Sequence, residues 1–320
     1  MQKIRIFSES SSSAMSSEQP KSSKISFASN VKKIFNTSMS SNCEKTVPNI
    51  IHHFWQGDIE PLGKHLDNLE KVATTNPSYK TQLHLLPRNS GDCKQVQQKL
   101  QNVHVIDLSK EKWFLEFQKT DRFKQFQASR SGERKHLASG ADIIKSELLA
   151  RKGGVWNDVD NPPVKPLPKK LTISKGDVLT AGPVVFKRWG GEKGVHSSTL
   201  ATHRNNKNLE KINSSSFEKY QRVQNVIYQK NSETDNCDDH FKMISATAGS
   251  LHLSRELFKQ SPSMKMEVDL LLRQEKKFGG IKVIMDEFFQ PTSTTGAGEL
   301  DEEQAKKLLA VMSAPGHVII

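Results

Sequence analysis

Two aspartates, Asp158 and Asp160, follow a short apolar segment that begins directly after the glycine pair Gly153-Gly154. The segment is typical of a buried strand, and two carboxylates at the end of such a strand can face one point. Carboxylate oxygens are preferred ligands of Mg²⁺ and Mn²⁺, which also bind diphosphate oxygens. A cation held by both aspartates would stabilise a leaving diphosphate, so the pair predicts a metal site used in group transfer. The alternative is a solvated turn, because Asp-x-Asp triplets are common.

The residues before these aspartates predict an α/β domain. β-branched and aromatic residues predict a strand over residues 50–55, and further apolar runs predict strands over residues 79–86 and 103–108. Apolar residues at helical spacing predict a helix over residues 63–75, between the first two strands. Strands that alternate with helices favour a sheet of parallel strands covered by helices.

The clearest helical pattern lies immediately before the glycine pair. Apolar residues recur every three or four positions over residues 133–151, and the two glycines then end the predicted helix. A strand is expected over residues 155–160, and it runs into a turn at Asn161-Pro162-Pro163. The other expected elements are a strand over 178–186 with a Gly-Pro interruption, a helix over 204–229, a strand over 281–285 and a helix over 302–312.

Composition divides the 320 residues into three parts. Fourteen of the first 41 residues are serine, so residues 1–45 are predicted to be a flexible leader that cannot bury enough surface to fold. Residues 46–295 form the predicted α/β domain, and residues 296–320 form a C-terminal tail with a short helix. No apolar run approaches the roughly 20 residues that span a bilayer, and the N-terminus lacks the apolar core of a classical signal peptide.

The sequence carries 47 Lys and Arg against 35 Asp and Glu, a formal net charge of +12. The basic residues are scattered, and no zinc-finger spacing, RRM signature or Walker A loop occurs, so nucleic acid is not the expected partner. A solvated basic surface is one interpretation. Attraction to a nucleotide diphosphate, an acidic protein or an anionic membrane surface is the other. The three cysteines show no CxxC spacing, which indicates a reducing compartment.

The segment ASGADIIK (residues 138–145), followed by GGVWNDVD (residues 153–160), resembles the sugar-nucleotide-binding region of DXD glycosyltransferases. That superfamily includes the large glucosylating toxins and the initiating α-mannosyltransferases. The step of 16 residues from Asp142 to Asp158 fits its pattern. Three weaker segments agree with the family in the same order, so that the resemblance covers about residues 47–292; they are residues 48–57, 246–251 and 283–291.

The resemblance implies a GT-A-type fold, a Rossmann-like mixed sheet flanked by helices. It also implies an enzyme, a hexosyltransferase that moves a sugar from a nucleotide-sugar donor, expected to be a UDP-sugar, to an acceptor with retention at the anomeric carbon. Asp158 and Asp160 would hold Mn²⁺ or Mg²⁺, Asp160 more directly. The chain would hold the acceptor oxygen near the anomeric carbon while the metal stabilises the departing diphosphate.

The same resemblance implies roles for single residues. Trp55 would pack on or hydrogen-bond the base of the nucleotide; its alternative is to fill the core at a strand end. Asp142 would accept hydrogen bonds from sugar hydroxyls, and Lys145 would contact the phosphates or the sugar. These two residues lie one helical turn apart, so the alternative for both is a helix-surface ion pair, worth about 0.3–0.5 kcal/mol.

Small residues form the rest of the implied donor site. Ala138 and Ser139 would let a sugar ring approach the backbone, although small residues also allow tight helix packing. Gly249 and Ser250 precede a predicted helix, so their N–H groups would meet an anion; the alternative is an ordinary loop. The adjacent histidines of the first strand, His52 and His53, point to opposite faces, so they are interpreted as core or surface residues and not as a metal pair.

The chain departs from the family pattern at several positions. Lys145 stands where the family usually has Arg, and Lys keeps the charge but loses the planar bidentate fork. Lys152 replaces an aromatic residue before the glycine pair, and Asn157 replaces an apolar residue before the acids. No Trp lies near the C-terminus, where the family closes over the nucleotide; residues 292–298 are the candidate replacement.

Three hypotheses remain open at this stage. The first is a glycosyltransferase that acts as a bacterial effector on a host protein, secreted into the host cell without a classical signal peptide. The second is a glycan-building transferase that works in the cytoplasm of its own cell. The third is a decayed transferase that binds a nucleotide or a partner without turnover, which the departures at Lys145 and Asn157 favour. Release of free sugar from a UDP-sugar with Mn²⁺ separates the enzymes from the binding module.

Overall fold

The computed structural model describes residues 44–131, 134–228, 237–273 and 288–289. The chain divides into a unit Met1–Asn42 and a unit Cys43–Ile320, and every described residue belongs to the second. The strand predicted over 281–285 and the helix predicted over 302–312 lie outside the described residues. In the part that is described, no helix is long and apolar enough to cross a membrane.

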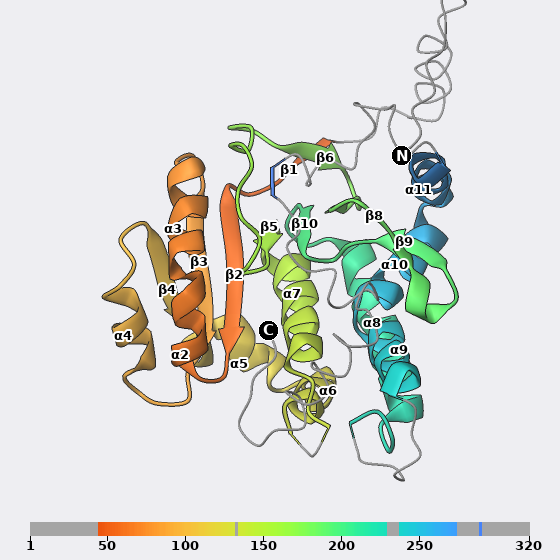
Figure 1. Cartoon of the computed structure of the whole chain (residues 1–320), viewed down its shortest axis with the longest axis horizontal. Helices are drawn as coiled ribbons and strands as arrows, with labels where there is room; N and C mark the ends of the chain where they lie inside the picture. Colours follow the sequence, from red (N-terminus) through yellow and green to blue (C-terminus); the bar gives the residue numbers. More distant parts are fainter. Residues whose placement is uncertain (1–43, 132–133, 229–236, 274–287, 290–320) are drawn as a thin grey trace, which may run out of the picture. The chain divides into compact units, whose positions relative to one another are not determined.

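A six-stranded mixed sheet forms the centre of the second unit (Figure 1). In spatial order its strands are β4 (Val103–Asp107), β3 (Lys80–Leu86), β2 (Ile50–Gln56), β5 (Gly154–Asn157), β10 (Thr199–Thr202) and β7 (Leu179–Thr180). The first four strands pair in parallel, as the alternation of strands and helices predicted. β10 pairs antiparallel with both β5 and β7. The expected mixed α/β architecture is therefore confirmed.

The expected elements differ from the observed ones mainly at their ends. β5 ends at Asn157 and not at residue 160, so both aspartates lie in the turn that follows the strand. The predicted strand over 178–186 is two strands, because β7 joins the central sheet while β8 (Pro183–Phe186) pairs antiparallel with β9 (Glu192–Val195). A third small sheet joins β1 (Glu44–Thr46) and β6 (Thr172–Ser174).

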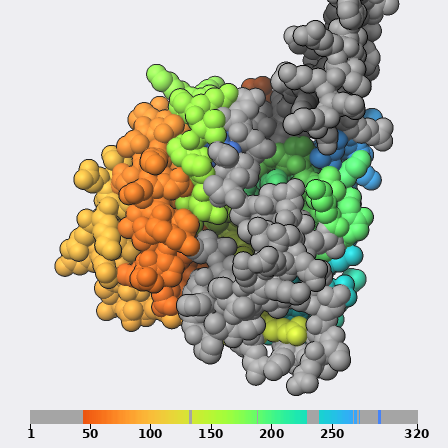
Figure 2. Space-filling view, in the orientation of Figure 1, coloured from red at the N-terminus to blue at the C-terminus, as the bar shows by residue number. Residues whose placement is uncertain are grey.

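Helices cover both faces of the sheet. α3 (Leu66–Thr75) and α4 (Asp92–Gln97) pack an apolar cluster against Trp55, Leu83 and Leu85. α2 (Ile59–Leu62) and a 3-10 turn, η1 (Gly63–His65), precede α3, so the helix predicted over 63–75 starts as a tighter turn. In Figure 2 the surface of α3 (orange) adjoins the segment after β5 (light green), where Asn68 donates to the carbonyls of Val159 and Asn161.

The other face carries the larger core, which includes Phe54, Trp156 and Leu200. Its helices are the following: α5 (Lys112–Phe117), α6 (Arg122–Arg130), α7 (Leu137–Lys152), α8 (Lys207–Val223), α10 (Ser250–Gln260) and α11 (Pro262–Arg273). α9 (Cys237–Thr247) packs against α10, and short 3-10 turns occur at η2 (Leu108–Lys110) and η3 (Lys187–Trp189).

Side-chain caps explain where the two long helices begin. α7 begins at Leu137 because Nδ1 of His136 accepts a hydrogen bond from the backbone N–H of Ser139 at 3.0 Å. α8 begins at Lys207 because Oδ1 of Asn206 accepts hydrogen bonds from the backbone N–H groups of Asn208 and Leu209 in the first turn. Both helices are therefore shorter than the sequence periodicity predicted.

The glycine pair that ends α7 has a geometric requirement. Gly153 and Gly154 have φ values of +64° and +105°, which favour glycine over other residues. A Cβ atom on Gly154 would lie 2.8 Å from Nε2 of His52, and one on Gly153 would lie 2.6 Å from the backbone nitrogen of Arg204. The pair therefore lets α7 end directly against β2 and β10 and enter β5 without an intervening loop.

Candidate functional site

Lys145 is the centre of the candidate site, and α7 places it there. Its side chain is 4% exposed. Its Nζ donates to Oδ1 of Asp142 at 2.9 Å and to the backbone carbonyl of Ser197 at 2.8 Å, and it lies 3.5 Å from Oδ1 of Asp158. Burial acts to lower the pKa of Lys145, but the two carboxylates outweigh it and hold that pKa above its ordinary value.

The ion pair between Asp142 and Lys145 forms as the helical spacing predicted, but it is not on the surface. The α7 positions of both residues face β5 and the start of β10, and Nζ of Lys145 lies 5.4 Å from the centre of the Trp156 ring. One ammonium group therefore joins an aspartate of the helix to an aspartate of the turn.

Asp158 and Asp160 lie together in the turn after β5. Oδ1 of Asp158 accepts a hydrogen bond from Nε1 of Trp156 at 2.7 Å, and its backbone N–H donates to the carbonyl of Ser198 at 2.9 Å. Burial raises the pKa of Asp158 to about 6, the charge of Asp160 acts in the same direction, and Lys145 partly opposes them. The charges of the two aspartates therefore interact, as the interpretation of a shared site requires.

Gly249 and Ser250 lie against the same group. A Cβ atom on Gly249 would lie 3.4 Å from Oδ2 of Asp142, in van der Waals contact, so the glycine lies directly beside that carboxylate. Oγ of Ser250 is 2.6 Å from Oγ of Ser197, whose carbonyl accepts from Lys145. α10 begins at Ser250, so its N-terminus, with its partial positive charge, lies next to the acidic residues. The fold therefore brings the start of α10 and the segment before β10 to α7 and the turn after β5.

Ala138 and Ser139 occupy the first turn of α7. Ala138 is exposed, whereas Ser139 is buried and its Oγ is 2.7 Å from the hydroxyl of Tyr228. Gly140 is required by packing, because a Cβ atom there would lie 2.7 Å from Nε2 of Gln56. The small residues of this turn thus serve close packing at least at Gly140, and the sugar-facing role of Ala138 and Ser139 stays a prediction.

Trp55 lies in the apolar cluster beneath α3 and is 4% exposed. Its Nε1 donates to the carbonyl of Asp58 at 2.9 Å, and its ring centre is 6.0 Å from that of His65. The same apolar cluster contains Val159, the residue between the two acids, so the indole belongs to the core against which the acidic turn packs. This placement matches core filling, the alternative for this residue, and the role in base binding stays a prediction.

The two adjacent histidines are core residues, as the sequence predicted. His52 lies on the α7 side of β2, where its Nε2 is 3.0 Å from the carbonyl of Gly153 and its Nδ1 is 3.0 Å from Nε2 of His84. Burial lowers the pKa of His52 to about 4 and that of His53 to about 3. Burial also lowers the pKa of His84 well below its ordinary value. All three rings are therefore neutral at physiological pH.

The carboxylates of Asp158 and Asp160 suit a hard cation that also binds a diphosphate. Among the described residues, no group of three or more His, Cys, Asp or Glu side chains is arranged to hold a metal ion. Mg²⁺ is commonly bound through only one or two carboxylates, with substrate phosphates supplying further oxygens. Asp158 and Asp160 provide that number of carboxylates and their charges repel each other, so a cation between them and a diphosphate fits these residues.

A small cavity lies behind Asp142 and Lys145. It has a volume of about 20 Å³, enough for one water molecule, and Arg122, Asn213 and His252 are among its lining residues. Nε of Arg122 and Oδ1 of Asn213 are buried without a hydrogen-bond partner among the described residues. The cavity therefore has both polar and apolar lining residues, the latter including Leu200 and Ile212.

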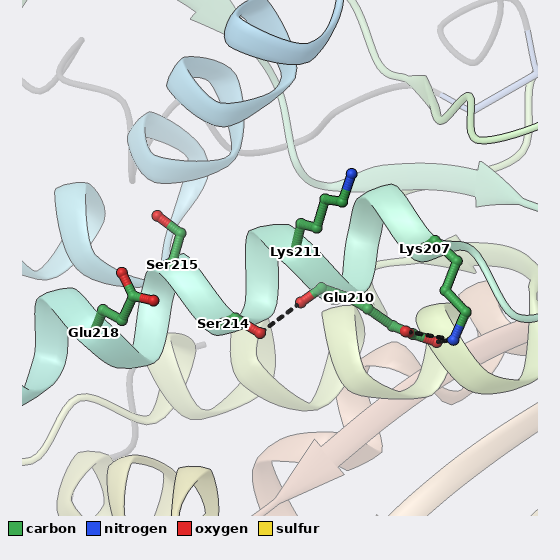
Figure 3. A pocket seen from close by; sticks show the side chains of 6 residues that line it. All are labelled: Lys207, Glu210, Lys211, Ser214, Ser215 and Glu218. Carbon is green, nitrogen blue, oxygen red and sulfur yellow. Dashed lines mark hydrogen bonds and ion pairs between the residues drawn. The ribbon is translucent and has the colours of Figure 1, made fainter.

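A larger hollow of about 420 Å³ lies along α8 (Figure 3). Its lining side chains all come from that one helix, and two of them, Lys207 and Glu210, form an ion pair with 2.8 Å between Nζ and Oε2. None of them belongs to the group around Lys145. The hollow is therefore a separate surface feature, and the candidate site remains the acidic turn with α7.

Sequence reasoning missed Ser197 and Trp156 as parts of this site. Ser197 supplies an acceptor for Lys145 and a partner for Ser250, but it lies in a polar stretch without recognisable spacing. Trp156 was visible only as a strand residue, although its indole N–H binds the first acid. An aromatic residue with an N–H two positions before an aspartate was the one available signal.

Comparison with known proteins shows which solved structures share this fold. No protein-family model matches the chain. The solved structure of the PaToxG glycosyltransferase is similar with a TM-score of 0.56 and 21% identity, over 77% of this chain and 82% of that chain. The chain has the fold of that glycosyltransferase. The expected fold resemblance is therefore confirmed.

Two further similarities concern toxins. A toxin of Photorhabdus asymbiotica subsp. asymbiotica is 29% identical over 153 residues, which are 45% of this chain and 5% of that protein. The chain thus matches only a small part of that relative's length. The catalytic domain of alpha-toxin from Clostridium novyi is more distant than PaToxG, with a TM-score of 0.44 and 11% identity over 68% of this chain and 70% of that chain.

Proposed function

We propose that the chain is a metal-dependent glycosyltransferase that moves a sugar from a nucleotide-sugar donor, a UDP-sugar, to an acceptor with retention. The observation that carries the proposal is the group formed by Asp142, Lys145, Asp158 and Asp160. One buried ammonium group there holds the helix acid 2.9 Å away and the turn acid 3.5 Å away. The shared fold with the PaToxG glycosyltransferase supports the same conclusion.

Each acid of the group would have a separate task. Asp158 and Asp160 would hold Mn²⁺ or Mg²⁺, which, when bound, supplies positive charge to the leaving diphosphate. Oδ1 of Asp142 is engaged by Lys145, which leaves Oδ2 to accept a hydrogen bond from a sugar hydroxyl. Lys145 would keep both acids in place and add positive charge near the phosphates.

The remaining residues would bind and orient the donor. Ser250 and Gly249 would present N–H groups at the start of α10 to an anionic oxygen. Ala138 and Ser139 would line the sugar side, and the indole of Trp55 would support the base side of the site through its contact with the acidic turn. The acceptor oxygen would be held on the open side of Asp142, near the anomeric carbon.

The similarity to a toxin supports a proposal about the acceptor and its location. We propose that the acceptor is a host protein and that the chain acts as an effector inside a host cell, because one similar relative is a toxin. A glycan acceptor in the producing cell is the alternative. Mass shifts in host lysate proteins after incubation with the chain and a UDP-sugar, as against new oligosaccharides, distinguish these two acceptors.

The test of the proposed reaction is release of free sugar from a panel of nucleotide sugars with Mn²⁺. We expect cleavage of one donor by the wild type and its loss in Asp160→Ala. Asp121→Ala is the matched control, because Asp121 forms an exposed ion pair with Lys124 on α6 and lies outside the site. A panel in which no donor is cleaved and none binds contradicts the proposal.

One observation favours a second candidate, a binding module without turnover. An ammonium group has three N–H donors. Nζ of Lys145 already has three partners, which are Asp142, the carbonyl of Ser197 and, at 3.5 Å, Asp158. In this arrangement no N–H of Lys145 is left to stabilise a departing phosphate. A donor that binds with Mn²⁺ but releases no sugar, with or without acceptor, supports this second candidate.

A further inference from the structure

The turn that carries the two acids is tied by buried amide side chains. Asn157, the last residue of β5, and Asn161, the residue after the second acid, are 0% and 1% exposed. Nδ2 of Asn157 donates to the backbone carbonyl of Asn161 at 3.0 Å, so one side chain spans the turn from its beginning to its end. The backbone N–H of Asn161 also donates to the carbonyl of Asp158 at 3.1 Å.

The start of β10 completes this arrangement. Thr199 is fully buried and is the register partner of Asn157, and its Oγ1 donates to Oδ1 of Asn157 at 2.9 Å. Nδ2 of Asn161 lies 3.3 Å from Oγ1 of Thr199, 3.3 Å from the carbonyl of Ser198 and 3.4 Å from Oδ1 of Asn157. We call Asn157, Asn161 and Thr199 the amide clamp.

The clamp lies where the sequence departs from the family pattern. Asn157 stands in place of an apolar residue, and burying an amide costs free energy unless its polar atoms are bonded. Here Nδ2 and Oδ1 of Asn157 both have partners, and Oδ1 has two. A leucine at this position would leave the hydroxyl of Thr199 and the side chain of Asn161 with fewer partners inside the protein.

The clamp also answers an electrostatic requirement. The charges of Asp158 and Asp160 repel each other, and this repulsion favours any backbone conformation that separates them. A turn with free backbone torsions would relax in that direction before a cation arrives. Hydrogen bonds across the turn oppose this relaxation, and groups that support metal ligands commonly change metal affinity 10- to 100-fold when removed.

We propose that Asn157, Asn161 and Thr199 are positioning residues that hold the acidic turn ready for a divalent cation. The inference rests on the proposed function, because it assumes that Asp158 and Asp160 bind the metal. It assigns these three residues no contact with the donor. They act through the backbone of residues 158–161, so their contribution is to cation affinity and not to the chemistry of transfer.

The test measures Mn²⁺ binding to the full chain by the EPR signal of free Mn²⁺, without any donor present. The variants are Asn157→Ala and Thr199→Val, and the second keeps the branched β-carbon and removes only the hydroxyl. Asn206→Ala is the matched control. Asn206 is also fully buried with four hydrogen bonds, but it caps α8 and lies at the far end of β10.

We expect both clamp variants to raise the Kd for Mn²⁺ about tenfold, and Asp160→Ala to abolish binding. Asn206→Ala should lower the melting temperature while the Kd for Mn²⁺ stays that of the wild type. In donor cleavage, the clamp variants should need more Mn²⁺ for half-maximal rate and recover the wild-type rate at saturating Mn²⁺. Such recovery is not expected if the variants only unfold the chain.

Two outcomes would overturn the inference, and they are distinguishable. If Mn²⁺ binds the wild type but not Asp160→Ala, and both clamp variants keep the wild-type Kd with reduced melting temperature, the amide clamp is structural only and the proposed function stands. If the wild type binds no Mn²⁺, the proposed metal site and the clamp fail together. Should Asn157→Ala fail to fold, Thr199→Val alone decides between these outcomes.

Discussion

The three buried histidines of β2 and β3 make a specific prediction about acid stability. His52, His53 and His84 are neutral in the folded chain because burial lowers their pKa values, to about 4 for His52 and about 3 for His53. In the unfolded chain each ring takes up a proton near pH 6.5. Below that pH the unfolded state binds more protons, so the free energy of unfolding falls as the pH falls.

The size of this effect follows from linkage. Between pH 7.5 and pH 5.5 His52 and His53, with folded pKa values of about 4 and about 3, each lower the free energy of unfolding by about 1.3 kcal/mol, or about 2.6 kcal/mol together. His84 acts in the same direction, because burial also lowers its pKa. Asp158 acts in the opposite direction, because its pKa is raised to about 6 and the folded state takes up that proton first. Asp158 offsets about 0.8 kcal/mol of the loss. We therefore expect a net loss of at least about 1.8 kcal/mol at pH 5.5.

The assay is urea unfolding at both pH values, followed by tryptophan fluorescence. His84→Gln keeps an N–H donor for Nδ1 of His52 but cannot titrate, so its loss between the two pH values should be smaller than that of the wild type. His104→Gln, at an exposed position of β4, is the control and should match the wild type. If His84→Gln and wild type lose the same amount, the buried pair does not titrate as described.

Three further changes test the site and its support. Lys145→Met removes the charge between Asp142 and Asp158, and we expect a loss of about 2–4 kcal/mol in urea unfolding together with loss of donor cleavage; a stable, active variant would contradict the central role of this residue. Gly154→Ala must place a Cβ 2.8 Å from His52 at φ +105°, so its melting temperature should fall clearly, by an amount equivalent to about 2 kcal/mol or more. Trp55→Phe removes the N–H bonded to the carbonyl of Asp58 and should cost about 1 kcal/mol. Its UDP affinity, measured by calorimetry, distinguishes core filling, which leaves the affinity unchanged, from contact with the base, which weakens it.

Local sequence patterns were sufficient for the parallel half of the sheet. The apolar runs of β2, β3 and β4 alternate with helices, and such runs depend on residues close in sequence. The pairing of Asp142 with Lys145 also followed from helical spacing. The sequence could not reveal that the pair is buried, because Asp158, just after β5, and Ser197, just before β10, meet it through two strands that pair antiparallel across more than 30 residues.

The exact ends of the strands, and the sheets that they join, could not be predicted from local sequence patterns either. β5 was predicted to continue to Asp160, because Val159 is apolar and suits a strand. It ends at Asn157 because that side chain bonds to the carbonyl of Asn161 and turns the backbone. A side chain that bonds to a backbone atom four residues later has no hydropathy signature. Likewise, β7 and β8 enter different sheets, and nothing in their composition distinguishes the partners.

The antiparallel insertion of β10 has a consequence for how proteins with this fold diversify. One wall of the site is the end of β5, and the opposite wall is the beginning of β10, so both walls lie at a single edge of the sheet. Between them the chain makes an excursion over residues 162–196, which departs from this edge and returns to it. The excursion contains β7, which pairs with β10, and insertions or deletions on either side of β7 leave the register of both walls intact. Homologous chains are therefore expected to vary most in the length of this excursion, where new surface for a different acceptor can be added without rebuilding the site.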